Sequence, residues 1–203
     1  ENWPYDWSDL CFSYAFQTNA ELQTAVDLWV SDNSSALASY GEINTWDVSL
    51  ITDMSDLFKD KSTFNDDIGN WDVSSVTDMG YMFSSASSFN QDLNDWDVSS
   101  VTTMSQMFKY ATSFNGDIST WDVSSVTSMY EMFFDAYVFN SDISGWDVSS
   151  VTNMRATFED CQVFNADISD WDVSNVTNML GTFIRTYDFN QDISGWDVSS
   201  VTN

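Results

Sequence analysis

The chain has 203 residues, and 43% of them are hydrophobic, so it can bury a sizeable core in spite of a formal net charge of −27. With 32 acidic residues against 5 basic ones, a nucleic-acid partner is excluded, because almost nothing is available to neutralise phosphates. The same imbalance disfavours docking on anionic lipid, and no apolar run approaches the roughly 20 residues that cross a bilayer.

Two helices are predicted near the start of the chain. Apolar residues over 22–29 recur at i, i+3, i+4 and i+7, which is the spacing of one helix face. Thr18 or Asn19 can cap the start of this helix. A second, shorter helix is expected over about 32–40, and Gly41 should end it.

These helices lie in residues 1–45, which we predict to form an N-terminal helical cap. A terminal repeat would otherwise expose its apolar end, and covering that end is the simplest role for the segment. A separate functional domain is the alternative, disfavoured because so short a segment has little core of its own. The chain begins at Glu1 without an initiator Met, as after signal-peptide removal or trimming, and its stop within a repeat suggests a longer array.

Residues 46–203 carry a repeat of 25 residues, with six full copies and a partial seventh and no insertion between them. Each copy reads approximately W-D-V-S-S-V-T-x-M-x-x-M-F-x-x-A-x-x-F-N-x-D-I-x-x. The first residue of the copies is Trp46, Trp71, Trp96, Trp121, Trp146, Trp171 and Trp196. A unit of this size cannot bury its apolar face alone, so neighbouring units must stack and share one core.

The repeat predicts the fold class. Phe64 and Ile68 alternate with polar residues, which favours a short strand, whereas apolar residues over 73–83 are three or four apart, which favours a tight turn or helical coil. We therefore expect a repeat solenoid, a leucine-rich-repeat-like stack with one short parallel strand per 25-residue rung behind the helical cap. Its tryptophans should form a single column.

The repeat closely resembles that of the BspA-like leucine-rich-repeat surface proteins of bacteria, mycoplasmas and marine microalgae. The segment 19–29, with Tyr40 and Gly41 before the first Trp-Asp-Val-Ser, resembles the cap that opens such arrays. The resemblance covers residues 16–203 and implies a secreted or surface-anchored protein, often associated with adhesion, with no catalytic residues to carry over. Met and Phe take the place of Leu, so a horseshoe curvature does not follow from it.

Two columns of aspartate recur with the repeat. One follows Trp, from Asp47 to Asp197, and one precedes Ile or Leu, from Asp67 to Asp192. We expect these carboxylates to accept hydrogen bonds from backbone N–H groups two or three residues on, as Asx turns and helix caps do. Ca²⁺ held between rungs is the alternative, but it needs six to eight oxygens per ion. No other cofactor is expected.

Serine and threonine columns run from Ser49 to Ser199 and from Thr52 to Thr202. We expect them to satisfy backbone groups, with an ice-binding face as a minor alternative. Asn33 and Asn175 begin glycosylation sequons, which matter only in a protein secreted from a eukaryote.

We predict that the chain is not an enzyme. It contains no His, which excludes Ser-His and Cys-His nucleophile systems, and its carboxylates repeat in columns instead of forming one unique pair. Cys161 occupies a small, buried repeat position held elsewhere by Ala. A bridge to Cys11, which lies in the cap several rungs away, is not expected.

Specificity is expected where the copies differ from one another, at residues 55–56 and 59–63 and their counterparts 25 residues on. All five basic residues fall there, together with aromatic residues outside the repeat pattern. Since aromatics and Arg dominate binding energies, we predict a partner-binding surface centred on repeats four to six. Its residues are Tyr110, Tyr130, Phe134, Tyr137, Arg155, Arg185 and Tyr187. Drift on an unused solvated face is the alternative.

Taken together, these features predict an extracellular or cell-surface repeat protein that acts by non-covalent binding of a protein or glycan. The alternative is a structural component of a coat, wall or filament that assembles with itself. A Ca²⁺-dependent scaffold and ice binding are minor alternatives. Neither nucleic acid nor direct membrane insertion is expected.

Overall fold

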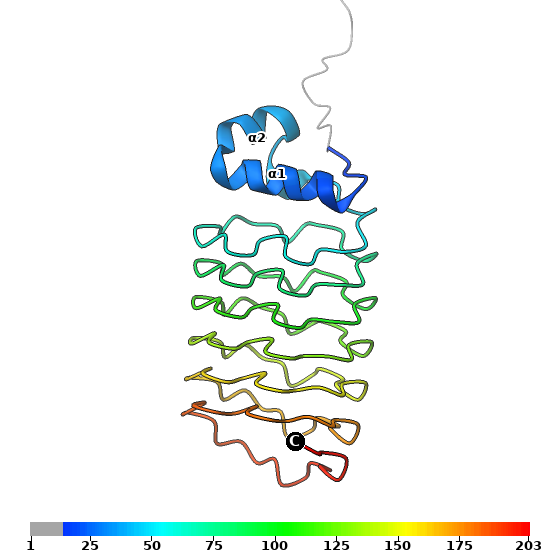
Figure 1. Ribbon diagram of the computed structural model, residues 1–203, viewed down its shortest axis with the longest axis vertical. Helices are drawn as coiled ribbons and strands as arrows, with labels where there is room; N and C mark the ends of the chain where they lie inside the picture. Colours follow the sequence, from blue (N-terminus) through cyan, green and yellow to red (C-terminus); the bar gives the residue numbers. More distant parts are fainter. Residues whose placement is uncertain (1–13) are drawn as a thin grey trace, which may run out of the picture.

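The computed structural model describes residues 14–203. Helices α1 (Asn19–Ser31) and α2 (Asn33–Tyr40) lie over one end of a stack of similar coils, and the short 3₁₀ helix η2 (Ile43–Thr45) leads into the first coil (Figure 1). Each coil, or rung, corresponds to one 25-residue repeat. The overall shape is therefore a column of rungs with two helices at its N-terminal end.

The helix boundaries follow from capping. The Thr18 hydroxyl accepts a hydrogen bond from the N–H of Glu21 at 3.3 Å, which confirms Thr18 as the N-cap of α1. Asp32 ends α1 and caps α2 through the N–H of Ser35 at 3.2 Å. Gly41 ends α2 with a φ of 76°, a conformation that costs glycine little. Both predicted helices are confirmed, and α2 begins one residue later than expected.

The predicted leucine-rich-repeat-like solenoid with a parallel strand in each rung is wrong. Within residues 14–203 no segment forms a strand, and the β-type pairings between successive rungs are isolated parallel bridges. One such bridge joins Asp53 to Asp78, and others follow every 25 residues up to Asn178. The rungs do stack, but they do so without a sheet.

Side chains replace the strand hydrogen bonds that were expected over 64–68. The N–H of Asn90 donates to the side-chain oxygen of Asn65 at 2.8 Å, and the N–H of Asn115 donates to that of Asn90 at 2.7 Å. Three further rungs continue this asparagine ladder. In a parallel sheet each of these N–H groups would donate to a backbone carbonyl of the neighbouring strand. Here the asparagine side chain accepts that hydrogen bond instead, so the extended segment makes no regular backbone ladder.

Tight turns occupy the segment that follows Met54 in each rung. There, alternate N–H groups bond to the next rung and the others close turns: Asp56 N–H donates to Gly80 at 3.0 Å, while Leu57 N–H donates back to Met54 at 3.3 Å. A parallel strand needs an extended backbone throughout, so these interleaved turns exclude one.

The core consists of stacked aromatic columns. Five of the six successive tryptophan pairs have ring centroids 6.1–6.5 Å apart, which confirms the predicted single column. From Trp71 onward each indole N–H also donates to the carbonyl 28 residues earlier, as Trp121 does to Leu93 at 2.8 Å. Two columns of phenylalanine run beside it, with centroids 5.3–6.1 Å apart along each column.

The helices close the first rung by continuing this packing. Trp29 of α1 lies edge-on to Trp46 at 5.7 Å, and its indole N–H donates to Asp66 at 2.8 Å. The Gln23 side chain donates to the carbonyl of Leu57 at 3.1 Å, a group that would otherwise face the open end. No helix in the described part of the chain is both long and apolar enough to cross a membrane.

Candidate ligand-binding face

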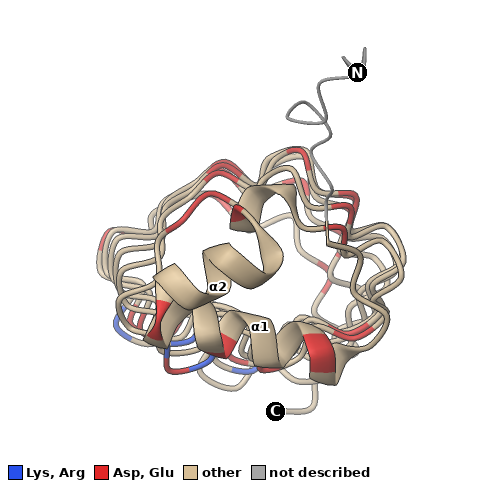
Figure 2. Cartoon of the chain, turned by 90° about the horizontal axis from the view of Figure 1, so that it is seen from above, with Lys and Arg blue, Asp and Glu red and all other residues tan. Residues whose placement is uncertain are grey.

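The variable face comprises residues 55–56 and 59–63 of the first repeat and their counterparts in each later one. The turns after each Met place it on the outside of the stack, on the side over which α1 lies. Figure 2 shows that the basic residues gather on this side, whereas acidic residues occur around the whole rim. The position below α1 is supported by the ion pair from Lys61 to Asp27 of that helix at 2.5 Å.

The backbone of the variable face has an unusual conformation. All eleven non-glycine residues with positive φ in the described chain fall at two repeat positions, those of Asp56 and Asp60. Gly181 occupies the same position as Asp56. A residue with a side chain costs about 1–2 kcal/mol in the left-handed region, where glycine is favoured. The face therefore holds side chains at positions where glycine would be more stable.

Exposed apolar side chains also concentrate on this face. Of the eleven large hydrophobic residues exposed in the described chain, eight lie there. They are Tyr81, Tyr110, Tyr137, Val138, Val163, Leu180, Ile184 and Tyr187. Among the predicted site residues, Tyr110, Tyr137 and Tyr187 are 41%, 40% and 70% exposed. Tyr130 and Phe134 are half-buried, and Arg155 and Arg185 are exposed.

The two arginines are already engaged by neighbouring rungs. Arg185 forms hydrogen bonds with both carboxylate oxygens of Asp160 and a further one with Glu159 at 3.2 Å, and the bond to Asp160 raises the pKa of the guanidinium. The guanidinium of Arg155 lies 5.5 Å from the ring centre of Tyr130. These contacts fix the side chains before any partner binds, which reduces the entropy lost on association.

Lys109 lies at the centre of the largest cluster on the face. Its amine lies 5.3 Å from the ring centre of Tyr110 and 4.9 Å from that of Phe134, and these two rings meet edge-on at 5.4 Å. The amine also donates to Glu131, which in addition accepts from the Gln106 amide at 2.6 Å. Gln106 and Glu131 are only 6% and 7% exposed.

Burial and hydrogen bonding have opposite effects on the pKa of Glu131. Burial alone raises the pKa of this carboxyl, but the hydrogen bonds from Lys109, Tyr130 and Gln106 outweigh it, so its pKa is lowered. Two other acidic residues of the face behave differently. Burial raises the pKa of Asp135 and Glu159, because their partners offset less of that cost.

Tyr137 and Tyr187 have partners other than the Lys109 amine. A hydrogen bond between the Tyr137 hydroxyl and Asp135 raises the pKa of the tyrosine. Tyr187 borders an open hollow of about 530 Å³. The other residues around this hollow are Asn140, Val163, Asn165, Asp188 and Asn190. The structure thus divides the seven predicted residues among several sites along the axis instead of joining them into one pocket.

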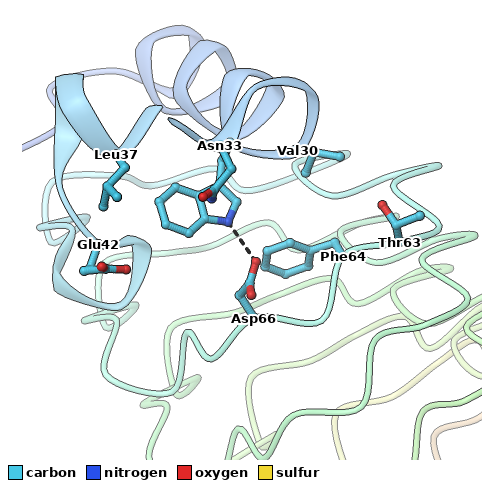
Figure 3. Close-up of a pocket in the computed structure, with 8 residues that line it drawn as sticks. Val30, Asn33, Leu37, Glu42, Thr63, Phe64 and Asp66 are labelled. Carbon is cyan, nitrogen blue, oxygen red and sulfur yellow. Dashed lines mark hydrogen bonds between the residues drawn. The ribbon is translucent and has the colours of Figure 1, made fainter. Parts of the chain in front are cut away.

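A second hollow, of about 410 Å³, lies between the helices and the first rung (Figure 3). Glu42, Asn33 and Leu37 line one side, and Thr63, Phe64 and Asp66 line the other. One oxygen of Asp66 is taken by the indole of Trp29. The sequon residue Asn33 is exposed at this hollow, and Asn175, which begins the other sequon, is exposed far along the stack.

The aspartate and threonine columns satisfy backbone groups, as predicted. In the first aspartate column, Asp97 accepts from the N–H of Ser99 at 3.1 Å and from its hydroxyl at 2.6 Å, which lowers the pKa of the carboxyl. The Thr77 hydroxyl donates to the carbonyl of Thr52 at 3.1 Å, and later rungs repeat this contact. Across residues 14–203 no three acidic or cysteine side chains gather as a metal site would require.

Cys161 is buried and free, and its thiol donates to the carbonyl of Phe133 at 2.9 Å. Burial raises the pKa of this thiol well above its usual value, which makes it a poor nucleophile. Cys11, and with it the prediction about a bridge, lies outside the described residues.

Sequence reasoning placed Gln106 and Glu131 at variable positions but did not include them among the candidate site residues. Both are polar residues at positions with positive φ, 60° and 51°, and both are buried. The comparison of repeats marks these positions as variable but carries no signal that their side chains turn inward. Only Gly181, the one glycine in that column, hints at the left-handed backbone.

A comparison with models of protein families supports the assignment of the chain as a repeat protein. The model described as "Mycoplasma protein of unknown function, DUF285" matches residues 28–143 and again 116–203. The chain therefore belongs to this family of repeat proteins. No curated protein and no solved structure matches the chain.

Proposed function

We propose that the chain is a BspA-like protein of the cell surface or extracellular space, without enzymatic activity, that binds a protein or glycan through the variable face. The single observation that carries this proposal is the segregation of side chains. Eight of the eleven large hydrophobic residues exposed within residues 14–203, and all five basic residues of the chain, lie on the face whose sequence differs from repeat to repeat. Exposed apolar surface of this kind is characteristic of interaction sites.

Pre-organisation supports the same proposal. Aromatic rings and guanidinium groups are the side chains that contribute most at interfaces, and here Arg155, Arg185 and Tyr110 are held by neighbouring rungs. The chain's acidic charge favours a neutral or basic partner, because like charges would otherwise slow association.

An array of extracellular-matrix proteins and glycans, probed with the labelled chain at physiological salt, tests the proposal. We expect binding to a small subset, which a Tyr187→Ser variant weakens and a Leu50→Ser variant leaves unchanged. Leu50 is a matched control because it is 59% exposed and lies outside the variable face. Absence of binding to every protein and glycan on the array would count against the proposal.

Self-assembly into a coat, wall or filament is the second candidate. The exposed apolar side chains of the variable face, such as Tyr137 and Val138, can pack against a second copy of the chain as well as against another partner. Size-exclusion chromatography with light scattering separates the candidates. A concentration-dependent increase in mass favours assembly, whereas a stable monomer favours the binding module.

A further inference from the structure

The buried part of the lysine cluster has a chemistry that surface binding does not use. A single oxygen of Glu131, Oε2, accepts hydrogen bonds from the Lys109 amine and from the Gln106 amide nitrogen. Because both nitrogens lie within hydrogen-bonding distance of one oxygen, the Lys109 amine lies near the amide group of Gln106. The Lys109 side chain is 19% exposed and that of Glu131 10%, so little water reaches the group.

The Gln106 amide oxygen has no hydrogen-bond partner. It is the one buried side-chain polar atom left unpaired in the part of the chain that the structure describes. Such an atom destabilises the folded state, because it has lost its hydrogen bonds to water and gained none in return. Turning the amide round would set this oxygen against the carboxylate of Glu131, so the charged carboxylate holds the amide in the orientation that leaves the oxygen unpaired.

We propose that Lys109 and Gln106 become joined by a side-chain amide bond that forms spontaneously, with Glu131 carrying protons. The reaction is a transamidation that releases ammonia, and it needs no oxidant, reductant or co-substrate. It is independent of the binding function proposed above.

The steps balance within the three side chains. The Lys109 ammonium gives one proton to Glu131, and the lone pair of its neutral nitrogen attacks the Gln106 carboxamide carbon. The protonated carboxyl can donate to the amide oxygen once the amide turns by half a revolution, which polarises the carbonyl and satisfies the unpaired atom. In the tetrahedral intermediate the former amide nitrogen turns back towards Glu131, and a second proton passes from the lysine nitrogen to the regenerated carboxylate and from there to this nitrogen. The carbon–nitrogen bond of Gln106 then breaks, and ammonia leaves with the remaining proton as ammonium.

The surroundings favour the reaction and set its pace. The rings of Tyr110 and Phe134 lie over the amine and limit its contact with water, and a backbone hydrogen bond closes the turn that joins Gln106 to Lys109. Because the charged pair is the resting state, the proton transfer is uphill and the bond should form slowly after folding. Once formed, the bond would lock the turn that precedes Tyr110.

The chain offers a matched pair that should not react. Lys59 occupies the same repeat position as Lys109, and Asp56, three residues earlier, occupies that of Gln106. The Lys59 amine lies 2.7 Å from the Asp56 carboxylate, and the two side chains are 39% and 52% exposed. The side chain that Lys59 contacts through this bond is a carboxylate, so there is no carboxamide for its amine to attack. Lys59→Arg is therefore the control for Lys109→Arg.

Intact-mass spectrometry of the full chain, after long incubation near neutral pH, tests the proposal. We expect the mass to fall by one ammonia. Trypsin should then fail to cut after Lys109 and should yield a single peptide 62–155, in place of 62–109 and 110–155. Lys109→Arg and Glu131→Gln should keep the full mass, and Lys59→Arg should still lose ammonia.

The unaltered chain alone can overturn the proposal, so the folding of the variants does not decide it. A full mass with complete cleavage after Lys109 would contradict the bond. Loss of ammonia that persists in Lys109→Arg would assign the loss to another residue and would equally contradict it.

Discussion

The aromatic columns and the variable face are built from the same 25-residue rungs, yet they follow opposite rules. In the columns each rung repeats the residue of the one before, as Trp121 repeats Trp96, and each ring stacks on an identical ring. On the variable face, residues such as Gln106 and Glu131 differ between rungs and hold left-handed backbone conformations that favour glycine. The comparison indicates that stability resides in the columns, which leaves the face free to vary.

The largest expected effect comes from breaking a column. Trp121→Ala should lower the free energy of unfolding by about 3–5 kcal/mol, because it leaves a cavity and removes the donor to the Leu93 carbonyl. Chemical denaturation measures the loss. Tyr187→Ala on the variable face should change stability by less than about 0.5 kcal/mol. Equal losses in the two variants would remove the distinction between columns and face.

The asparagine ladder should contribute less per residue. Asn115→Ala removes the acceptor of the Asn140 N–H, at 2.7 Å, and should cost about 1 kcal/mol. Asn190 accepts no hydrogen bond from a backbone N–H within the described residues, so Asn190→Ala is the matched control and should be near neutral. Thermal melts of both variants compare them. An unchanged melting temperature in Asn115→Ala would show that the ladder is not what replaces the strands.

Two alanines test whether the left-handed backbone of the variable face is strained. Ala156 has a φ of 53°, whereas Ala111, also buried, lies outside the left-handed region. Ala156→Gly removes about 1–2 kcal/mol of backbone strain from the folded state. This gain offsets the stability lost with the buried methyl group and with the greater conformational entropy of the unfolded chain. We expect it to be neutral or stabilising, and Ala111→Gly to destabilise by about 1 kcal/mol. The reverse order in equilibrium unfolding would contradict the strained-face account.

The smallest expected effect concerns divalent metal. Because turn N–H groups and serine hydroxyls already occupy oxygens of Asp97 and its counterparts, Ca²⁺ should not raise the melting temperature more than Mg²⁺ does at equal ionic strength. Both ions should stabilise slightly through the high negative charge. A shift specific to Ca²⁺ that disappears in Asp97→Asn would overturn the hydrogen-bonding assignment.

Much of the architecture was readable from the sequence because it depends on repetition and local capping. The fixed spacing of Trp46 and its counterparts predicted the column, and Thr18 and Gly41 marked helix ends through their own side-chain or backbone chemistry. The strands were predicted wrongly because alternation at Phe64 and Ile68 reports only which side chains are buried. It does not reveal that the Asn65 side chain accepts the hydrogen bond from the Asn90 N–H, which a backbone carbonyl would accept in a sheet.

The candidate site was less predictable for a physical reason. Variation among repeats located the face, but the contacts on it depend on residues that meet across rungs, such as Lys109 with Glu131, 22 residues apart. The burial of Gln106 goes with its hydrogen bond to Glu131 of the next rung, since Tyr81 has nearly the same φ at the equivalent position and is exposed.

The most direct test of the account measures binding by the face and stability of the columns in the same variants. Once the array gives a ligand, its dissociation constant is compared for the unaltered chain, for a triple Tyr110→Ser, Tyr137→Ser, Tyr187→Ser variant and for Leu50→Ser. We predict that the triple variant binds at least about tenfold more weakly, an effect of roughly 1.4 kcal/mol, with melting nearly unchanged, and that Leu50→Ser behaves as the unaltered chain. Unchanged affinity in the triple variant, or a loss of affinity matched by a loss of folding, would contradict the claim.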